Sequence, residues 1–273
     1  MHDFKDISIL IHVQIDVQDR IDNLTGVMDY YYNNCENVQF VIVNDDAEPD
    51  NRLKDLYAKY GDTSKFLFQK NADMYHRTKA FNQASTNTDR DFLIAGDTDV
   101  IVHPTHLLSC VEMMRDDENI GAMYPYNGLF IHVSDKHKQT ILETHNIDFL
   151  DQYIPDKEHQ IPNYENDDIL VAHHQSQGGC NMFRHKHWKT FNGYNPGFIG
   201  WGSEDNEINH RVQVMGFLFE RYMNPTAIAW HLPHHNTVRD KEPYCSRNDR
   251  LCNAISTIRT KTEMEKYIST WKL

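Results

Sequence analysis

The stretch DFLIAGDTD, residues 91–99, decides the fold class. Residues 91–96 form a short, largely apolar run of the length expected for a strand buried within a sheet. The run stops at Asp97-Thr98-Asp99, where two carboxylates lie one residue apart. In parallel α/β sheets, ligands bind beyond the carboxyl ends of the strands, so this acidic turn is the first candidate for a functional site.

The residues before this stretch show the same alternation of apolar strands and amphipathic helices. Strands are expected at residues 7–13, 38–43, 66–68 and 91–96, and helices at residues 17–32, 49–60 and 74–84. This order predicts an α/β fold with a mixed, mainly parallel sheet flanked by helices. Polar clusters at residues 14–20, 44–46 and 97–99 follow three of the strands, and we expect them to meet in one site.

The remaining chain is less regular. We expect a single catalytic domain over residues 1–235, with a nucleotide-binding half at 1–100 and an acceptor-binding half at 101–235. A polar insert at about 134–170 is either an acceptor-binding lid or a surface excursion. Residues 236–273 are expected to form a helical tail.

Bulk composition narrows the class of protein. The chain has 273 residues, 40% of them hydrophobic, and no apolar run long enough for a transmembrane helix. Its start lacks a signal-peptide pattern, so we expect a cytoplasmic protein. Five scattered cysteines indicate free thiols. The net charge of −13 disfavours non-specific nucleic-acid binding, although the tail after residue 235 carries eight Lys or Arg against five Asp or Glu.

Acidic and imidazole side chains form a candidate metal site. Carboxylate oxygens of Asp97 and Asp99 suit Mg²⁺ or Mn²⁺, which also bind diphosphate oxygens. His231, His234 and His235 form the densest histidine cluster, and one or two of these imidazoles could complete the coordination, which favours Mn²⁺. A mixed His and Asp set could also indicate a zinc hydrolase, but the His-Glu-x-x-His motif is missing.

Two adjacent acids provide a candidate general base. Glu204 and Asp205 begin an expected helix and follow Trp201 and several glycines. They could simply stabilise the helix start, or one could take the proton of an acceptor hydroxyl. Trp201 would offer a flat face to a sugar ring, and the glycines would let the loop close and exclude water.

Further polar residues could bind a nucleotide. Asp45 and Asp46 could accept hydrogen bonds from a base imide or from ribose hydroxyls, and Arg20 and Arg77 could contact a diphosphate or a base. Each of these residues could equally have a surface role. The glycine pair Gly178-Gly179 indicates a close backbone approach or a turn before a strand.

On these residues the chain resembles a GT-A fold glycosyltransferase over roughly residues 5–235. The N-terminal half resembles the inverting family that includes chondroitin- and hyaluronan-type synthases. The C-terminal half resembles the domain shared by animal β-galactosyltransferases, polypeptide N-acetylgalactosaminyltransferases and bacterial chondroitin polymerases. The residues that carry the resemblance are Arg20 to Leu24, Val43 to Asp46, HRTKA at 76–80, Asp97 to Asp99, GG at 178–179, FNGYN at 191–195 and GWGSEDNE at 200–207.

The resemblance implies specific roles. Asp99 would bind the metal, Asp97 would support the donor, and Asp205 would be the catalytic base with Glu204 as a sugar contact. His231 and His234 stand where animal galactosyltransferases have a Met-x-x-His metal pair, and His235 competes for that role. The paired Glu-Asp resembles inverting members, which implies a β-linkage made from a UDP-α-sugar with Mn²⁺ or Mg²⁺.

The acceptor is left open by the sequence. A growing glycan is the first expectation, and a modified nucleobase in phage DNA is the alternative that keeps the same chemistry. A non-catalytic module that binds sugar or nucleotide is a third reading, which the complete set of Asp99, Asp205 and the histidines disfavours.

Overall fold

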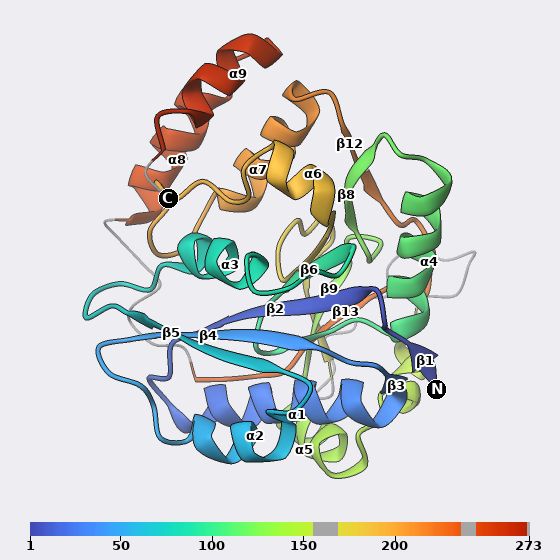
Figure 1. Cartoon of the computed structure of the whole chain (residues 1–273). Helices are drawn as coiled ribbons and strands as arrows, with labels where there is room; N and C mark the ends of the chain where they lie inside the picture. Colours follow the sequence, from blue (N-terminus) through green and yellow to red (C-terminus); the bar gives the residue numbers. More distant parts are fainter. Residues whose placement is uncertain (155–168, 236–243, 272–273) are drawn as a thin grey trace.

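The computed structural model describes residues 1–154, 169–235 and 244–271. Its centre is a seven-stranded sheet with the order β12-β8-β11-β6-β2-β4-β5 (Figure 1). The strands are β2 Ile7–Val13, β4 Phe40–Asp46, β5 Lys65–Lys70, β6 Phe92–Gly96, β8 Ile120–Tyr124, β11 Cys180–Arg184 and β12 Leu218–Arg221. Only β11 runs antiparallel to its neighbours in this sheet, so the predicted mixed, mainly parallel sheet is confirmed.

Helices cover both faces of this sheet (Figure 1). One face carries α1 Gln18–Asn34 and α2 Leu53–Tyr60, and the other carries α3 Arg77–Ser85, α6 His185–Thr190 and α7 Glu204–Val214. A further helix, α4 Pro104–Asp116, packs beside β8. The buried apolar residues divide into two clusters, one on each face, because strand residues alternate between the two faces.

Two element boundaries differ from the sequence expectation near the site. The strand expected at residues 38–43 extends through Asp46, and the helix expected from residue 49 begins at Leu53. The reason is a local turn: Asn44 Oδ1 accepts the Asp50 N–H at 3.0 Å, and Asp50 Oδ1 accepts the Arg52 N–H at 2.8 Å. These side-chain acceptors compete with helical hydrogen bonds.

A second, four-stranded sheet has the order β10-β9-β13-β7. Its strands are β7 Val100–Ile101, β9 Phe130–Val133, β10 Ile169–His173 and β13 Ala229–His231, and a small pair joins β1 His2–Asp3 to β3 Cys35–Glu36. His231 pairs with His132 on one side and with Val100 on the other. This register brings two distant histidines beside the turn that follows β6.

The expected insert at residues 134–170 begins with regular structure. It contains α5 Asp135–Thr144, which packs against α1, and the 3₁₀ helix Asp148–Tyr153. Residues 155–168 lie outside the described residues, so the acceptor-binding lid stays a prediction.

The described part of the C-terminal tail is helical. It contains α8 Tyr244–Ile255 and α9 Lys261–Ile268, and both helices contact α7. Cys252, Ile255 and Met264 belong to the same buried cluster as Phe81 and Tyr194. The two helices therefore add to the core on the α7 face. No helix in the described ranges combines the length and hydropathy needed to cross a bilayer.

Candidate active site

The turn Asp97-Thr98-Asp99 follows β6, and its two carboxylates face different partners. Asp97 Oδ1 lies 2.9 Å from Arg77 Nη2, whereas Asp99 Oδ2 lies 3.2 Å from Arg20 Nη1. The Asp97 N–H donates to the Gly179 carbonyl at 2.9 Å, which ties the turn to the start of β11. The turn therefore presents one carboxylate to each of two clusters of side chains.

The first cluster can hold a cation. In the described part of the chain, Asp99, His231 and His234 are the one group of three or more His, Cys, Asp or Glu residues whose ligand atoms all lie within 4.8 Å of one another. Asp99 Oδ1 is 3.6 Å from His231 Nε2, and Asp99 Oδ2 is 3.4 Å from His234 Nε2. Burial lowers the pKa of His231 to about 3, so its imidazole is neutral and can act as a ligand. One carboxylate and two imidazoles fit a divalent cation such as Mn²⁺.

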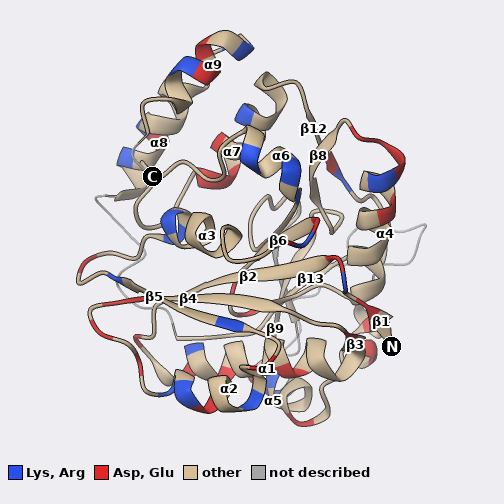
Figure 2. Ribbon diagram, viewed as in Figure 1, with Lys and Arg blue, Asp and Glu red and all other residues tan. Residues whose placement is uncertain are grey.

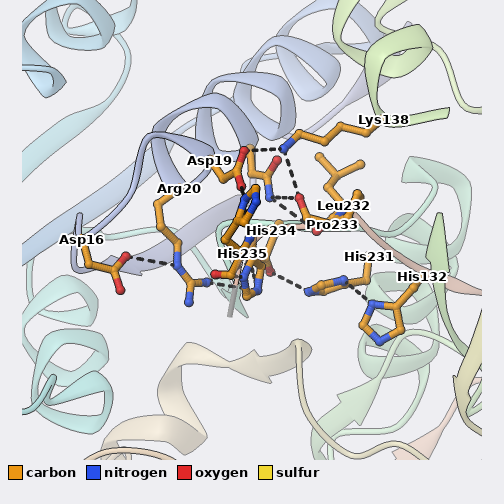
Figure 3. Close-up of polar contacts among 12 residues, drawn as sticks. Asp16, Asp19, Arg20, His132, Lys138, His231, Leu232, Pro233, His234 and His235 are labelled. Carbon is orange, nitrogen blue, oxygen red and sulfur yellow. Dashed lines mark hydrogen bonds and ion pairs between the residues drawn. The ribbon is translucent and has the colours of Figure 1, made fainter. Parts of the chain in front are cut away.

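His235 lies outside this cluster (Figure 3). Its Nδ1 is 2.6 Å from Asp19 Oδ2, and its side chain is 89% exposed. Asp19 also contacts Lys138 Nζ at 3.3 Å. The geometry therefore favours His231 and His234 over His235 as partners of Asp99.

Arg20 reaches the same cluster from α1 (Figure 3). Its Nη1 lies 3.3 Å from His234 Nε2 as well as 3.2 Å from Asp99 Oδ2, and its Nε lies 3.7 Å from Asp16 Oδ1. The guanidinium thus contacts two of the three atoms that a metal ion would use. The candidate ligand atoms of Asp99 and His234 therefore already contact one positively charged group, the guanidinium of Arg20.

The second cluster joins the turn to the start of α7. Arg77 Nη1 lies 2.7 Å from Glu204 Oε1 and 3.4 Å from Asp205 Oδ2, while Nη2 contacts Asp97. The basic start of α3 therefore meets the acidic start of α7 (Figure 2). Arg77, which the sequence suggested as a diphosphate or base contact, bridges three carboxylates here.

The carboxyl group of Asp205 is oriented by two donors. Its Oδ1 accepts hydrogen bonds from Asn181 Nδ2 at 2.8 Å and from the Tyr194 hydroxyl at 3.0 Å. Desolvation raises the pKa of Asp205 to about 7, Arg77 opposes this shift, and the nearby carboxylates of Glu204 and Asp97 add to it. A carboxyl with a pKa near neutrality can take up a proton during a reaction.

Asp45 and Asp46 make contacts within the protein. Asp45 is fully buried, and its Oδ2 lies 3.1 Å from His12 Nε2 and accepts the His76 N–H. Asp46 Oδ2 accepts the Ile15 N–H at 3.0 Å. These bonds fix the segments that follow β2 and β5, so both residues shape the edge of the site. Their contact with a donor stays a prediction.

The loop before α7 carries an exposed aromatic ring. Trp201 is 59% exposed, while its backbone carbonyl accepts a hydrogen bond from Asn248 Nδ2 of α8 at 3.2 Å. The same Asn248 Nδ2 donates to the Ile199 carbonyl at 2.9 Å. The loop is therefore anchored by α8.

Gly179, directly before β11, lies close to β9. It has a φ of +82°, and a Cβ there would lie 2.7 Å from the Phe130 ring. Only glycine therefore fits the approach of β11 to β9.

Three solved structures are similar in fold to this protein. GalNAc-T7 with UDP, GalNAc and Mn²⁺ superposes with a TM-score of 0.63 at 11% identity, covering 92% of this chain and 48% of that one. S. aureus TarS in complex with UDP-GlcNAc has a TM-score of 0.56 at 9% identity, covering 96% of this chain and 70% of that one. Mannosyltransferase PcManGT from Pyrobaculum calidifontis in complex with GDP-Man and Mn²⁺ has a TM-score of 0.51 at 13% identity, covering 98% of this chain and 65% of that one. The chain has the GT-A glycosyltransferase fold.

Two sequence comparisons each match about a quarter of the chain. A family model described as the N-terminal domain of galactosyltransferase matches residues 168–235. Beta-1,4-galactosyltransferase 5 of Danio rerio is 30% identical over 67 residues, which are 24% of this chain and 18% of that protein. The chain thus matches less than a fifth of the length of this curated relative. The residues matched by the family model include Asp205, His231 and His234.

Within this GT-A fold, most predicted site residues meet around one acidic turn. The cluster at Asp99 gathers Arg20, His231 and His234, and the cluster at Asp97 gathers Arg77, Glu204 and Asp205. Sequence reasoning missed three contacting residues. Tyr194 lies in the FNGYN motif and Asn181 follows the GG pair, so both had a signal, whereas nothing in the sequence marks His132.

Proposed function

We propose that the protein is a metal-dependent glycosyltransferase. It transfers a hexose or N-acetylhexosamine from a UDP-sugar to a hydroxyl group of a glycan. The observation that carries this proposal is the placement of Asp97 and Asp99, one facing the candidate base Asp205 through Arg77 and the other facing two imidazoles. The nucleotide sugars or nucleotides bound to all three similar structures, and the Mn²⁺ in two of them, support it.

The cation site consists of Asp99, His231 and His234. Their mixed oxygen and nitrogen donors suit Mn²⁺ better than Mg²⁺. The chemistry that a divalent cation would supply there is neutralisation of the charge on the leaving diphosphate. Asp97 would support the donor from the opposite side of the turn, and Arg20, which contacts Asp99 here, would pair with the diphosphate.

Asp205 acts as the general base. Its carboxylate takes the proton of the acceptor hydroxyl as the acceptor oxygen forms a bond to the anomeric carbon. The bond from that carbon to the diphosphate oxygen breaks, and UDP leaves with the electron pair. In-line displacement inverts the configuration, so a UDP-α-sugar gives a β-linked product.

The remaining residues bind and enclose the substrates. Glu204 contacts one of the two sugars, and the exposed ring of Trp201 covers a sugar face while its loop excludes water. Asp45 and Asp46 contribute to recognition of the base or ribose, and the backbone at Gly179 approaches the donor closely.

A panel of UDP-sugars, with GDP-mannose as an added donor, tests the proposal through release of the nucleotide. We expect release from a UDP-sugar only when Mn²⁺ or Mg²⁺ is present. Asp205→Asn should lower the rate by about 100-fold or more, since a general base contributes factors of this size. Glu265→Gln, an exposed acid on α9, is the matched control and should keep the wild-type rate. Equal rates for wild type and Asp205→Asn would remove Asp205 as the base.

A further inference from the structure

His132 contacts His231 of the candidate cation site, and nothing in the sequence around His132 predicts this contact. It lies on β9, directly beside His231 on the parallel neighbour β13. The two Nδ1 atoms are 2.7 Å apart, and the rings meet edge to face with centroids 4.3 Å apart (Figure 3). This distance is that of a hydrogen bond, so one Nδ1 carries the shared hydrogen and the other accepts it.

The surroundings of His231 decide which nitrogen donates. Its Nε2 faces Asp99 Oδ1 at 3.6 Å and belongs to the group of possible ligand atoms, so this nitrogen must be free of hydrogen to bind a cation. A neutral imidazole then carries its hydrogen on Nδ1. His132 Nδ1 accepts that hydrogen, and the hydrogen of His132 lies on Nε2.

We propose that His132 is a positioning residue for the cation site, which fixes the tautomer and the ring orientation of His231 by accepting its Nδ1–H. This inference rests on the proposed function, because it takes Asp99, His231 and His234 as the ligands. Metal-bound histidines usually donate their second ring N–H to a carboxylate, a backbone carbonyl or a water, and here a nitrogen of His132 takes that place. Loss of such a partner typically weakens metal binding by about 10–100-fold.

The packing supports a positioning role over direct ligation. Among the described residues, His132 is the one hydrogen-bond partner of His231 Nδ1. The ring of Phe130 packs against His231 at 5.4 Å and against His132 at 5.9 Å, which closes the apolar side of the pair. His132 is not part of the group whose ligand atoms lie close enough to share an ion with Asp99.

Titration of the protein with Mn²⁺, followed by the electron paramagnetic resonance of free Mn²⁺ with and without UDP, tests this role. We expect His132→Phe to weaken Mn²⁺ binding by about 10–100-fold. His132→Asn should retain most of the affinity, since the Asn side-chain oxygen can accept the same N–H. His174→Phe, an exposed histidine that directly follows β10, is the matched control and should bind as the wild type does.

Two further measurements distinguish the outcomes. Electron spin-echo spectra of bound Mn²⁺ should show the same number of coordinated nitrogens in His132→Phe as in wild type, and one nitrogen fewer would make His132 a ligand and overturn the inference. Long-range ¹⁵N–¹H spectra of the wild-type histidines need no variant. They should place hydrogen on Nδ1 of His231 and on Nε2 of His132, and the reverse tautomers would also overturn it.

The result for wild type separates this inference from the proposed function. If wild type binds Mn²⁺ and His132→Phe binds it equally tightly, only the role of His132 is wrong. If wild type binds no Mn²⁺ with or without UDP, the metal assignment in the proposed function is wrong, and the inference is overturned with it.

Discussion

Arg77 and Asp205 lie 3.4 Å apart, and the same guanidinium contacts Asp97 at 2.9 Å. One arginine at the start of α3 therefore connects the acidic turn after β6 with the start of α7. Because Arg77 favours the charged form of Asp205 while desolvation opposes it, the protonation of the candidate base depends on this contact.

The rate of the wild-type enzyme should depend on the protonation of Asp205. Its pKa is raised to about 7, so the carboxyl stays partly protonated at neutral pH and cannot then accept a proton. We expect kcat/KM for UDP release to fall as the pH drops through about 7 and to level off at higher pH. A profile of the rate from pH 5 to 9 measures this limb. A limb near pH 4, as for an ordinary aspartate, would contradict the assignment.

Removal of Arg77 should move that limb to higher pH. Since Arg77 lowers the pKa of Asp205, Arg77→Met leaves desolvation and the neighbouring carboxylates unopposed, and the pKa rises further. The rate near pH 7 should therefore decrease and recover in part at alkaline pH. Lys79→Met, which removes an exposed positive charge from the same helix, is the control. An unchanged pH profile in Arg77→Met would show that Arg77 does not tune Asp205.

The absence of a side chain at Gly178 leaves room for the carboxylate of Asp205. A Cβ at this position would lie 2.8 Å from Asp205 Oδ2. Gly178→Ala should displace the carboxylate and lower kcat by about 100-fold, since small misplacements of a reacting group have effects of this size. Mn²⁺ binding should be retained, because the cluster at Asp99 does not include Gly178. A variant with wild-type activity would argue that Asp205 acts from a different position.

Arg20 should compete with the cation. Its guanidinium contacts Asp99 and His234, two of the three candidate ligands, so Arg20→Met should bind Mn²⁺ more tightly when UDP is absent. The same variant should bind UDP less tightly in the presence of Mn²⁺, because the proposed partner of the diphosphate is lost. Calorimetry measures both affinities, and Arg52→Met, an arginine paired with Asp50 near α2, is the control. Weaker Mn²⁺ binding in Arg20→Met would contradict this competition.

Local sequence patterns were sufficient for strands β2, β4, β5 and β6 of the large sheet and for the acidic turn. The apolar run at residues 91–96 predicted β6, and the GWGSEDNE motif led to Asp205 at the start of α7. Spacing alone did not distinguish His234 from His235. After Pro233 the chain turns so that His234 faces Asp99 while His235 contacts Asp19. The direction of this turn depends on tertiary contacts.

Long-range register explains what the sequence did not reveal. His132 and His231 are 99 residues apart and meet only because β9 and β13 pair in one register. The three partners of Arg77 likewise come from segments that are distant in sequence. A single sequence contains no signal for such pairings, since they are set by the packing of whole strands.

The binding of UDP to wild type and to Asp99→Asn, measured by calorimetry with and without Mn²⁺, tests the central claim most directly. The claim is that Asp99 and two histidines hold a cation that binds the donor diphosphate. We predict that wild type binds UDP tightly only with Mn²⁺, and that Asp99→Asn loses this dependence on the metal together with the affinity. Equal UDP affinity of wild type in the presence and absence of Mn²⁺ would contradict it.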